Sequence, residues 1–423
     1  MSYENPQPKE KCRSCGSKNL VDIISLGNQF ITDFYDSADH KTDSMPLELI
    51  LCDPKKDGCG LLQLKHTTSR ERMYRQYWYR SGINQTMRDA LADVTANIES
   101  LISLEPGDVV IDIGSNDSTL LKSYKTSGLK LVGFEPAKNL MEYAKIENGT
   151  IINDYFNYAE YQKIFGDKKA RAITSIAMFY DLEDPNIFVD DIKNSLADDG
   201  ILIIQMNYLV SMLEQNAFDN IGHEHLEYYS LYALEHLLNR HALEVFDVEL
   251  NDINGGSFRI YVKHNGANTR TPDGAQERLN SLRQKESEIG LNDLKIYKEF
   301  ANRLEELKNK TVNFIKEETQ KGKTVYLYGA STRGNTLLQY YDLDSKLITA
   351  AAERNPDKWG KYTVGTAIPI ISEEQARKEK PDYFLVLPWA FIKEFVKRET
   401  EFLKDGKFIV PLPEFEIIGS SQE

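Results

Sequence analysis

The sequence predicts an α/β protein in three parts: an N-terminal zinc-binding module, a central Rossmann-like domain and a C-terminal Rossmann-like lobe. Three observations predict this arrangement. All four cysteines lie within the first 59 residues, buried-strand patterns recur through the middle of the chain, and a second strand–loop–helix pattern begins near residue 323. Strands that alternate with helices are typical of a parallel sheet covered on both faces. We place the three parts at residues 1–75, 76–270 and 271–423.

The composition is that of an ordinary globular protein, and it excludes several functional classes. The chain has 423 residues, 41% of them hydrophobic and 27% charged, with a formal net charge of −14. This length predicts two to three domains. The acidic balance offers no basic surface for nucleic acid or an anionic membrane. The sequence has neither an apolar run of about 18 residues nor an apolar signal segment at its start, so we expect a cytoplasmic protein.

The four cysteines form two pairs. Cys12 and Cys15 make a C-x2-C knuckle followed by Gly16, and Cys52 and Cys59 are separated by six residues. Four thiolates match a tetrahedral Zn²⁺ site and leave no position open for water. Without an export signal, a metal is a better interpretation than two disulfides. We therefore predict a structural zinc that holds the N-terminal module together, with four unrelated buried thiols as the alternative.

The central part predicts a Rossmann-like sheet with a binding site at its strand ends. An apolar run over 108–114 ends in Gly114, and a second over 129–134 is followed by Glu135, 21 positions after that glycine. An acidic residue at this spacing takes ribose hydroxyls. The glycine triad that a pyrophosphate needs is absent, so a class I S-adenosylmethionine (SAM) methyltransferase domain is favoured over an NAD domain. Further strands are predicted at 172–179, 200–206, 243–250 and 257–263.

A dense group of acid and base side chains follows in the segment Gly222-His223-Glu224-His225. On a helix the two histidines would lie about 200° apart and could not share a metal on one face. In an extended or irregular segment they could point to one side. A carboxylate beside an imidazole can raise its pKa and orient its tautomer, which suits proton abstraction. The alternative is a polar loop whose histidines cap neighbouring helices.

The last third predicts a helical linker and a second Rossmann-like lobe. Residues 274–323 are rich in Glu, Lys, Arg and Leu and contain no proline, which is typical of long amphipathic helices. Residues 323–335 begin a strand–loop–helix unit, and further strands are predicted at 347–352 and 383–388. The loop of this unit offers N–H groups and a cation for a phosphate, although a tight β–α turn with incidental polarity is the alternative. Its candidate ligands are Gly329, Ser331, Thr332 and Arg333.

The ordered series of motifs resembles the three-domain, zinc-containing sugar C-methyltransferases, which are SAM-dependent and methylate carbon 3 of nucleotide-linked 4-ketosugars. The resemblance runs nearly end to end, and its ordered series is specific although each motif alone is weak. It implies SAM as cofactor, S-adenosylhomocysteine (SAH) as product, a structural zinc, a nucleotide-sugar substrate bound partly by the C-terminal lobe, and a monomer. The motifs are the four cysteines, Tyr77-x-Tyr79-Arg80-Ser81-Gly82, Asp112-Ile-Gly114-Ser115-Asn116-Asp117, His223-Glu224-His225, Gly255-Gly256-Ser257-Phe258-Arg259, Tyr328-Gly329-Ala330 and Pro388-Trp389.

The resemblance also implies residue roles. His225 is expected to be the general base with Glu224 as its partner, and Tyr77 is expected to line the reacting sugar. His223 and Asp181 complete the expected catalytic group. The expected cofactor ligands are Asp112, Gly114, Ser115, Asn116, Glu135, Tyr79 and Met178. Arg259 joins the four loop residues of the C-terminal lobe as an expected substrate ligand.

Two positions depart from the family pattern. Gly222 stands where the family usually has a tyrosine, and Asp181 stands where it usually has a histidine. Asp181 can replace that histidine as a hydrogen-bonding group but carries a different charge. Three alternatives to C-methylation stay open at this point: O-methylation of a sugar hydroxyl, an NAD-dependent sugar-nucleotide oxidoreductase, and a non-catalytic zinc-stabilised binding protein.

Overall fold

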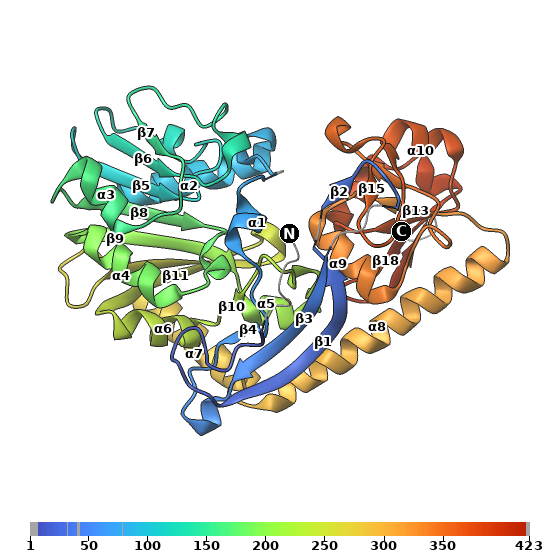
Figure 1. Cartoon of the computed structure of the whole chain (residues 1–423), viewed down its shortest axis with the longest axis horizontal. Coiled ribbons are helices and arrows are strands. Elements are labelled where there is room, and N and C mark those ends of the chain that lie inside the picture. The colour runs from blue at the N-terminus through green and yellow to red at the C-terminus, as the bar shows by residue number, and fades with distance from the viewer. Residues whose placement is uncertain (1–6, 32, 40–42, 78, 420–423) are drawn as a thin grey trace.

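Three large sheets organise the chain in a computed structural model that describes residues 7–31, 33–39, 43–77 and 79–419. In Figure 1 the central lobe lies on the left and the C-terminal lobe on the right. The N-terminal strands β1 (Leu20–Phe30) and β3 (Ser44–Cys52) run between the two lobes. Each predicted part of the chain therefore contributes one sheet, and the N-terminal part reaches both of the others.

The N-terminal sheet is antiparallel, with strand order β1-β3-β4-β10. Its strand β4 (Leu62–Leu64) pairs with β10 (Glu227–Tyr228), a two-residue strand from the centre of the chain. The backbone N–H of Leu64 also donates to the carbonyl of Leu226 at 2.9 Å. The zinc module is thus completed by a segment that lies immediately after His225.

The central sheet has the order β11-β12-β9-β8-β5-β6-β7, in which β12 runs antiparallel to both neighbours. The parallel strands are apolar runs buried on both faces, as a sheet covered by helices requires. The strand order reverses at β5, and in such sheets ligands bind at the carboxyl ends beside that point. The strands are β5 (Val109–Ile113), β6 (Lys130–Phe134), β7 (Thr150–Ile152), β8 (Ala170–Ile176), β9 (Leu196–Asn207), β11 (Leu243–Asn251) and β12 (Ser257–His264).

Helices cover this sheet, and most of them begin at a residue whose side chain caps the helix. The carboxylate of Asp184 accepts from the N–H groups of Asn186 and Ile187, and Pro185 occupies the first turn of its helix. Both features favour a helix start because they satisfy or remove free N–H groups. The helices are α2 (Gln85–Leu101), α3 (Tyr158–Phe165), α4 (Pro185–Ser195), α5 (Leu209–Glu214) and α6 (Leu231–Arg240).

Two helices, α7 (Ala275–Ile289) and α8 (Leu294–Gln320), lead from the central lobe to the C-terminal lobe, and α8 spans the lower right of Figure 1. The C-terminal sheet has the order β16-β14-β13-β17-β18-β19 and is parallel except for β19. Among the described residues no helix has the length and apolarity needed to cross a bilayer. The strands and helices of the lobe are β13 (Val325–Tyr328), α9 (Thr332–Tyr341), β14 (Ala351–Glu353), β16 (Ile370–Ser372), α10 (Glu373–Glu379), β17 (Tyr383–Val386), α11 (Ile392–Arg398), β18 (Lys407–Val410) and β19 (Glu416–Ile418).

A two-stranded ribbon joins the N-terminal part to the C-terminal lobe. Strand β2 (Phe34–Tyr35) pairs with β15 (Tyr362–Thr363). Nearby, the N–H of Phe30 donates to Oε1 of Gln339 on α9 at 2.7 Å. The N-terminal segment is therefore tied to each of the two Rossmann-like lobes by backbone pairing.

Candidate active site and zinc centre

A cavity of about 370 Å³ lies at the carboxyl ends of the central strands and extends to the start of α9 in the C-terminal lobe. Its volume is that of a small-molecule site. It brings together four of the predicted catalytic residues and every predicted cofactor ligand. These residues are Tyr77, Asp181, Glu224 and His225, and Tyr79, Asp112, Gly114, Ser115, Asn116, Glu135 and Met178.

Two buried carboxylates define the cofactor end of the cavity. Glu135 accepts from the backbone N–H groups of Asn116 at 2.8 Å and Ala137 at 2.7 Å. Burial nevertheless raises the pKa of Glu135 above its ordinary value. Asp112 accepts from the hydroxyl of Thr174 at 2.6 Å, and burial raises the pKa of Asp112 to about 7. Both groups face a ligand site in place of bulk water, so each can take a hydroxyl or a cation from a ligand.

The loop after β5 fits SAM in two further respects. Ser115 Oγ is buried and has no hydrogen-bond partner among the described residues, so a ligand group can supply one. Gly114 has a φ of +71°, and a Cβ there would lie 3.3 Å from Cγ of Met178. The glycine therefore permits the turn and keeps the backbone open to a ligand.

The same loop holds the tyrosine segment over the cavity. The side chain of Asn116 accepts from the N–H of Ser81 at 3.0 Å and donates to the carbonyl of Tyr79 at 3.0 Å. The carboxylate of Asp117 accepts from the N–H of Gly82 at 2.8 Å. Tyr77 is anchored separately, because its N–H and carbonyl both bond the side chain of Asn139.

His225 has a defined tautomer. Its Nδ1 lies 2.6 Å from the carbonyl oxygen of Asn220, which can only accept, so Nδ1 carries the proton. Nε2 then bears the lone pair, and it lies 3.7 Å from Oε1 of Glu224. The edge-to-face ring of Tyr180 packs against the imidazole with centroids 4.7 Å apart. This arrangement presents one basic nitrogen next to a carboxylate that can pair with the imidazolium once it forms.

Three tyrosines and a further carboxyl group line the cavity together with His225: Tyr74, Tyr77, Tyr180 and Asp181. The hydroxyl of Tyr74 donates to the carbonyl of Glu224 at 2.7 Å. Burial raises the pKa of Tyr77 and Tyr180 well above the ordinary value, so both phenols keep their protons. Burial, aided by the nearby charge of Glu224, also raises the pKa of Asp181 well above its ordinary value. Asp181 Oδ1 has no hydrogen-bond partner among the described residues.

His223 does not line the cavity. Its Nε2 donates to the carbonyl of Met45 on β3 at 3.3 Å, and burial lowers the pKa of His223 to about 4. A neutral, buried imidazole that contacts the N-terminal sheet is poorly suited to exchange protons with a substrate. Of the catalytic residues expected from sequence, His223 is therefore the one that the structure does not place in the cavity lining.

The predicted substrate ligands are divided. Thr332 and Arg333 line the cavity, but Gly329 and Ser331 do not. Ser331 instead caps α9, with its Oγ accepting from the N–H of Gly334 at 2.9 Å. Arg259 is buried away from the cavity, where it donates to Gln205 at 2.8 Å and Asp93 at 2.7 Å.

Sequence reasoning missed several lining residues. Tyr155 and Phe156 follow β7, and Asn207 ends β9, so each lies at a carboxyl strand end where a ligand site was expected. The position after a predicted strand was the available signal. Asn220 acts through its backbone carbonyl, which any residue carries, so no sequence signal could have identified it.

The four cysteines converge. Their sulfur atoms all lie within 4.8 Å of one another, and none forms a disulfide. A tetrahedral zinc with Zn–S bonds of about 2.3 Å places its sulfurs about 3.8 Å apart, so the cluster fits the predicted metal. The amide nitrogen of Gln63 lies 3.2 Å from Cys12 Sγ and can donate to it. Gln63 belongs to β4 and faces Glu227 of β10 in the register of the sheet, which places the zinc ligands close to the His225 segment.

Together, the sheet order and the residues at its strand ends define a class I SAM-dependent methyltransferase with a structural zinc site. Three family models match: "Putative zinc binding domain" over residues 12–74, "Methyltransferase domain" over 79–248 and "C-methyltransferase C-terminal domain" over 252–413. The C-methyltransferase NovU of Streptomyces niveus is 31% identical over 98% of each chain. The chain belongs to this C-methyltransferase family, and it is a SAM-dependent C-methyltransferase.

Two solved methyltransferase structures match less than half of this chain. The plantazolicin methyltransferase BpumL in complex with SAH is 12% identical, covers 42% of this chain and 84% of its own, and has a TM-score of 0.33. A SAM-dependent methyltransferase from Clostridium acetobutylicum is 13% identical, covers 42% of this chain and 91% of its own, and has a TM-score of 0.32. The family assignment therefore rests on the full-length relative and the three family models.

Proposed function

We propose that the enzyme methylates carbon 3 of a nucleotide-linked 4-ketosugar. One observation carries the proposal: a histidine whose unprotonated ring nitrogen lies beside a carboxylate shares one cavity with the strand-end residues of a SAM domain. A carbon nucleophile needs a base because a C–H bond must ionise first. A ketone next to that carbon makes the ionisation feasible.

His225 is proposed to remove the C3 proton through Nε2. The carbonyl of Asn220 holds the other nitrogen protonated, so the ring accepts the proton at one defined atom. Glu224 then pairs with the imidazolium, at a starting separation of 3.7 Å. A positioned base of this kind contributes on the order of 10²- to 10⁴-fold.

Proton donors are proposed to stabilise the enolate oxygen that forms at C4. Tyr77 and Asp181 both line the cavity, and burial raises the pKa of each, which favours the protonated form. A neutral carboxylic acid at Asp181 donates where an ionised one would repel the oxyanion. Loss of one such donor costs on the order of 3 kcal/mol of transition-state stabilisation.

The two ligands are proposed to lie at opposite ends of the cavity. Asp112, Glu135 and the N–H groups of the loop after β5 would hold SAM, which when bound supplies an electrophilic methyl group. Thr332 and Asn254 line the end toward the C-terminal lobe, and the nucleotide would bind there. Holding both reactants in line is worth roughly 7–11 kcal/mol, the largest single contribution available to the site.

The test replaces the base with a side chain that keeps a hydrogen bond but loses basicity. For His225→Asn we expect methyl transfer to fall at least about 100-fold, while SAH binding measured by calorimetry is unchanged. Deuterium incorporation at C3 of a 4-ketosugar nucleotide in heavy water, without SAM, should be lost in parallel. The matched control is His264→Asn, because His264 ends β12 and does not line the cavity.

Either of two results would remove the proposal. Normal turnover of the His225→Asn enzyme would exclude the base. A product whose new methyl group is attached through oxygen would exclude the ketone-activated carbon.

A further inference from the structure

An ion pair joins the two lobes at Asp219, the residue before Asn220, whose carbonyl bonds His225. Arg333, at the start of α9 in the C-terminal lobe, bonds the carboxylate of Asp219 through Nε at 3.1 Å and Nη2 at 2.8 Å. Asp219 belongs to the central lobe and is only 4% exposed. Trp389 of the C-terminal lobe donates to the same oxygen at 3.2 Å. Two side chains of the C-terminal lobe therefore bind a single buried carboxylate of the central lobe.

The carboxylate of Asp219 lies next in sequence to Asn220, the residue that bonds His225. Asp219 and Asn220 are consecutive residues of one short 3-10 turn, Phe218–Asn220. The carbonyl of Asn220 fixes the protonated nitrogen of His225, and the side-chain oxygen of Asn220 accepts from Asn207 at 2.7 Å. A displacement of the turn would move that carbonyl and release the imidazole.

We infer that Arg333 and Asp219 are positioning residues: their ion pair lets the C-terminal lobe set the orientation of the base His225. The inference rests on the proposed function, because it assigns a purpose to the orientation of that imidazole. It also changes the role expected for Arg333 from sequence, where it was a phosphate ligand. A guanidinium committed to a buried carboxylate is not free to bind a diphosphate at full strength.

Charge balance supports this assignment. Asp219 Oδ1 has no hydrogen-bond partner among the described residues, so Oδ2 carries the contacts of this carboxylate. Removing one partner of a buried pair leaves an uncompensated charge, which is strongly destabilising. Arg333 also donates to the carbonyl of Asn254 at 3.1 Å, which fixes the guanidinium from a second direction.

Opposite outcomes separate positioning from phosphate binding. If Arg333 positions His225 through Asp219, then Arg333→Gln and Asp219→Asn should each lower kcat by about 10- to 100-fold, the size of effect that misplacing a reacting group produces. KM for the nucleotide sugar should stay within about twofold, and the double variant should resemble the single variants because both act through one contact. If Arg333 binds phosphate, Arg333→Gln raises KM, whereas Asp219→Asn frees the cation and lowers KM or leaves it unchanged.

A matched control removes stability as an explanation. Arg278 of α7 pairs at 2.6 Å with Asp247 of β11, which is 1% exposed, and neither residue lines the cavity. Arg278→Gln should lower the melting temperature as Arg333→Gln does but leave kcat unchanged. Arg333→Lys, which keeps the charge, should recover part of kcat. SAH calorimetry on every variant verifies that the cofactor end is intact.

The inference is overturned if Asp219→Asn turns over normally, or if the two single variants act additively on KM alone. The proposed function fails differently, since normal turnover by His225→Asn would exclude the base itself. An inactive His225→Asn enzyme together with an active Asp219→Asn enzyme would exclude only the positioning role.

Discussion

In both Rossmann-like lobes a glutamate at the end of the second strand accepts hydrogen bonds from two backbone N–H groups, but the side chains around that glutamate differ. Glu135 after β6 accepts from the N–H groups of Asn116 and Ala137. In the C-terminal lobe, Glu353 ends β14 and accepts from Ala330 and Asn355, each at 2.9 Å. The glycine after the first strand also matches, because the N–H groups of Gly114 and Gly329 donate to the residues preceding these two glutamates.

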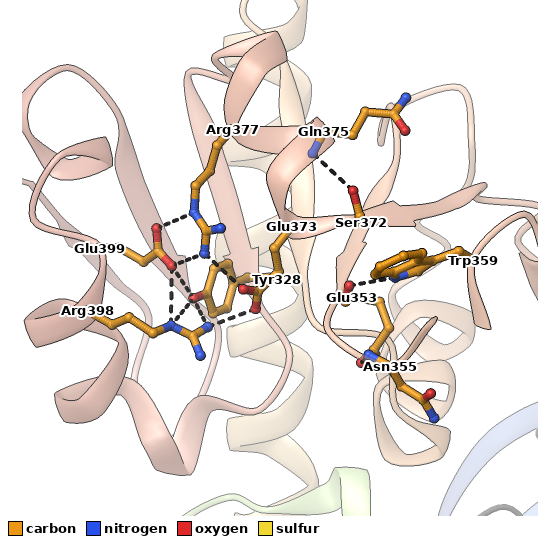
Figure 2. A network of polar contacts seen from close by, with 10 residues as sticks. All are labelled: Tyr328, Glu353, Asn355, Trp359, Ser372, Glu373, Gln375, Arg377, Arg398 and Glu399. Atoms are coloured by element: carbon orange, nitrogen blue, oxygen red, sulfur yellow. Dashed lines mark hydrogen bonds and ion pairs between the residues drawn. The ribbon is translucent and has the colours of Figure 1, made fainter. Parts of the chain in front are cut away.

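The crevices of the lobes are nonetheless different. In the C-terminal lobe a Cβ on Gly329 would lie 2.9 Å from Cγ of Pro388, and one on Gly334 would lie 2.6 Å from Leu387. Pro388 and Leu387 therefore pack closely against these two glycines. Figure 2 shows the surroundings: the indole of Trp359 donates to the carbonyl of Glu353 at 2.9 Å, and ion pairs surround Tyr328.

The ion-paired side chains around Tyr328 are Glu373, Arg377, Arg398 and Glu399. Their charges satisfy one another within the lobe, so they are not directed at a ligand. The comparison teaches that the strand–glycine–acid pattern specifies a local geometry, and that the side chains packed over it decide whether this geometry binds.

The largest effect should come from removing zinc, and it should fall on the central lobe. The N-terminal module pairs with β10 of that lobe, next to His225. We expect removal of zinc by a chelator, or Cys52→Ser, to abolish methyl transfer, since a structural zinc supplies about 10–16 kcal/mol of folding free energy. Hydrogen exchange measured by mass spectrometry should rise in β3, β4 and residues 223–228 but not in β13 or β17. Full protection of residues 223–228 in the zinc-free protein would show that the central lobe holds its base unaided.

A matched pair of glutamate variants sharpens the comparison. Glu135→Ala and Glu353→Ala each remove a carboxylate that accepts from two backbone N–H groups, so both should lower the melting temperature. Only Glu135→Ala should weaken SAH binding, by at least about tenfold, because a hydrogen bond to a charged group is worth about 1.5–3 kcal/mol. Titration calorimetry measures both. Equal losses of SAH affinity would mean that the C-terminal crevice also holds the cofactor.

Sequence reasoning succeeded where a signal was local. The cysteine spacing, the strand runs and the distance from Gly114 to Glu135 are short patterns, and the structure places each in one cluster, sheet or cavity. It stopped at contacts between distant segments. The two-residue strand β10 is too short to show a hydrophobic period in the sequence. The loop that contains Arg333 has the composition of a phosphate-binding loop, and only the structure shows that Arg333 pairs with Asp219.

The smallest predicted effect concerns pH, and it arises from one more difference between the two lobes. Asp112 lies two residues before Gly114, whereas the corresponding position before Gly329 is Leu327. Burial raises the pKa of Asp112 to about 7 in the folded protein, so the carboxylate ionises mainly above that pH. The α-ammonium group of SAH should then bind more tightly as the carboxylate charges, by about eightfold between about pH 6 and about pH 7.5.

Stability should change in the opposite sense. A carboxyl group whose folded pKa is raised contributes stability that is present below its ordinary pKa and is lost as the pH rises toward about 7. Asp112→Asn should therefore melt at a higher temperature than the unaltered enzyme at about pH 8 without ligand, while its SAH affinity is weaker and independent of pH. Calorimetry across the pH range, with thermal melts of both proteins, measures the two trends together. If Asp112→Asn kept the pH dependence of SAH binding, the titrating group would be Glu135 instead, because it is the other buried carboxylate at this end of the cavity.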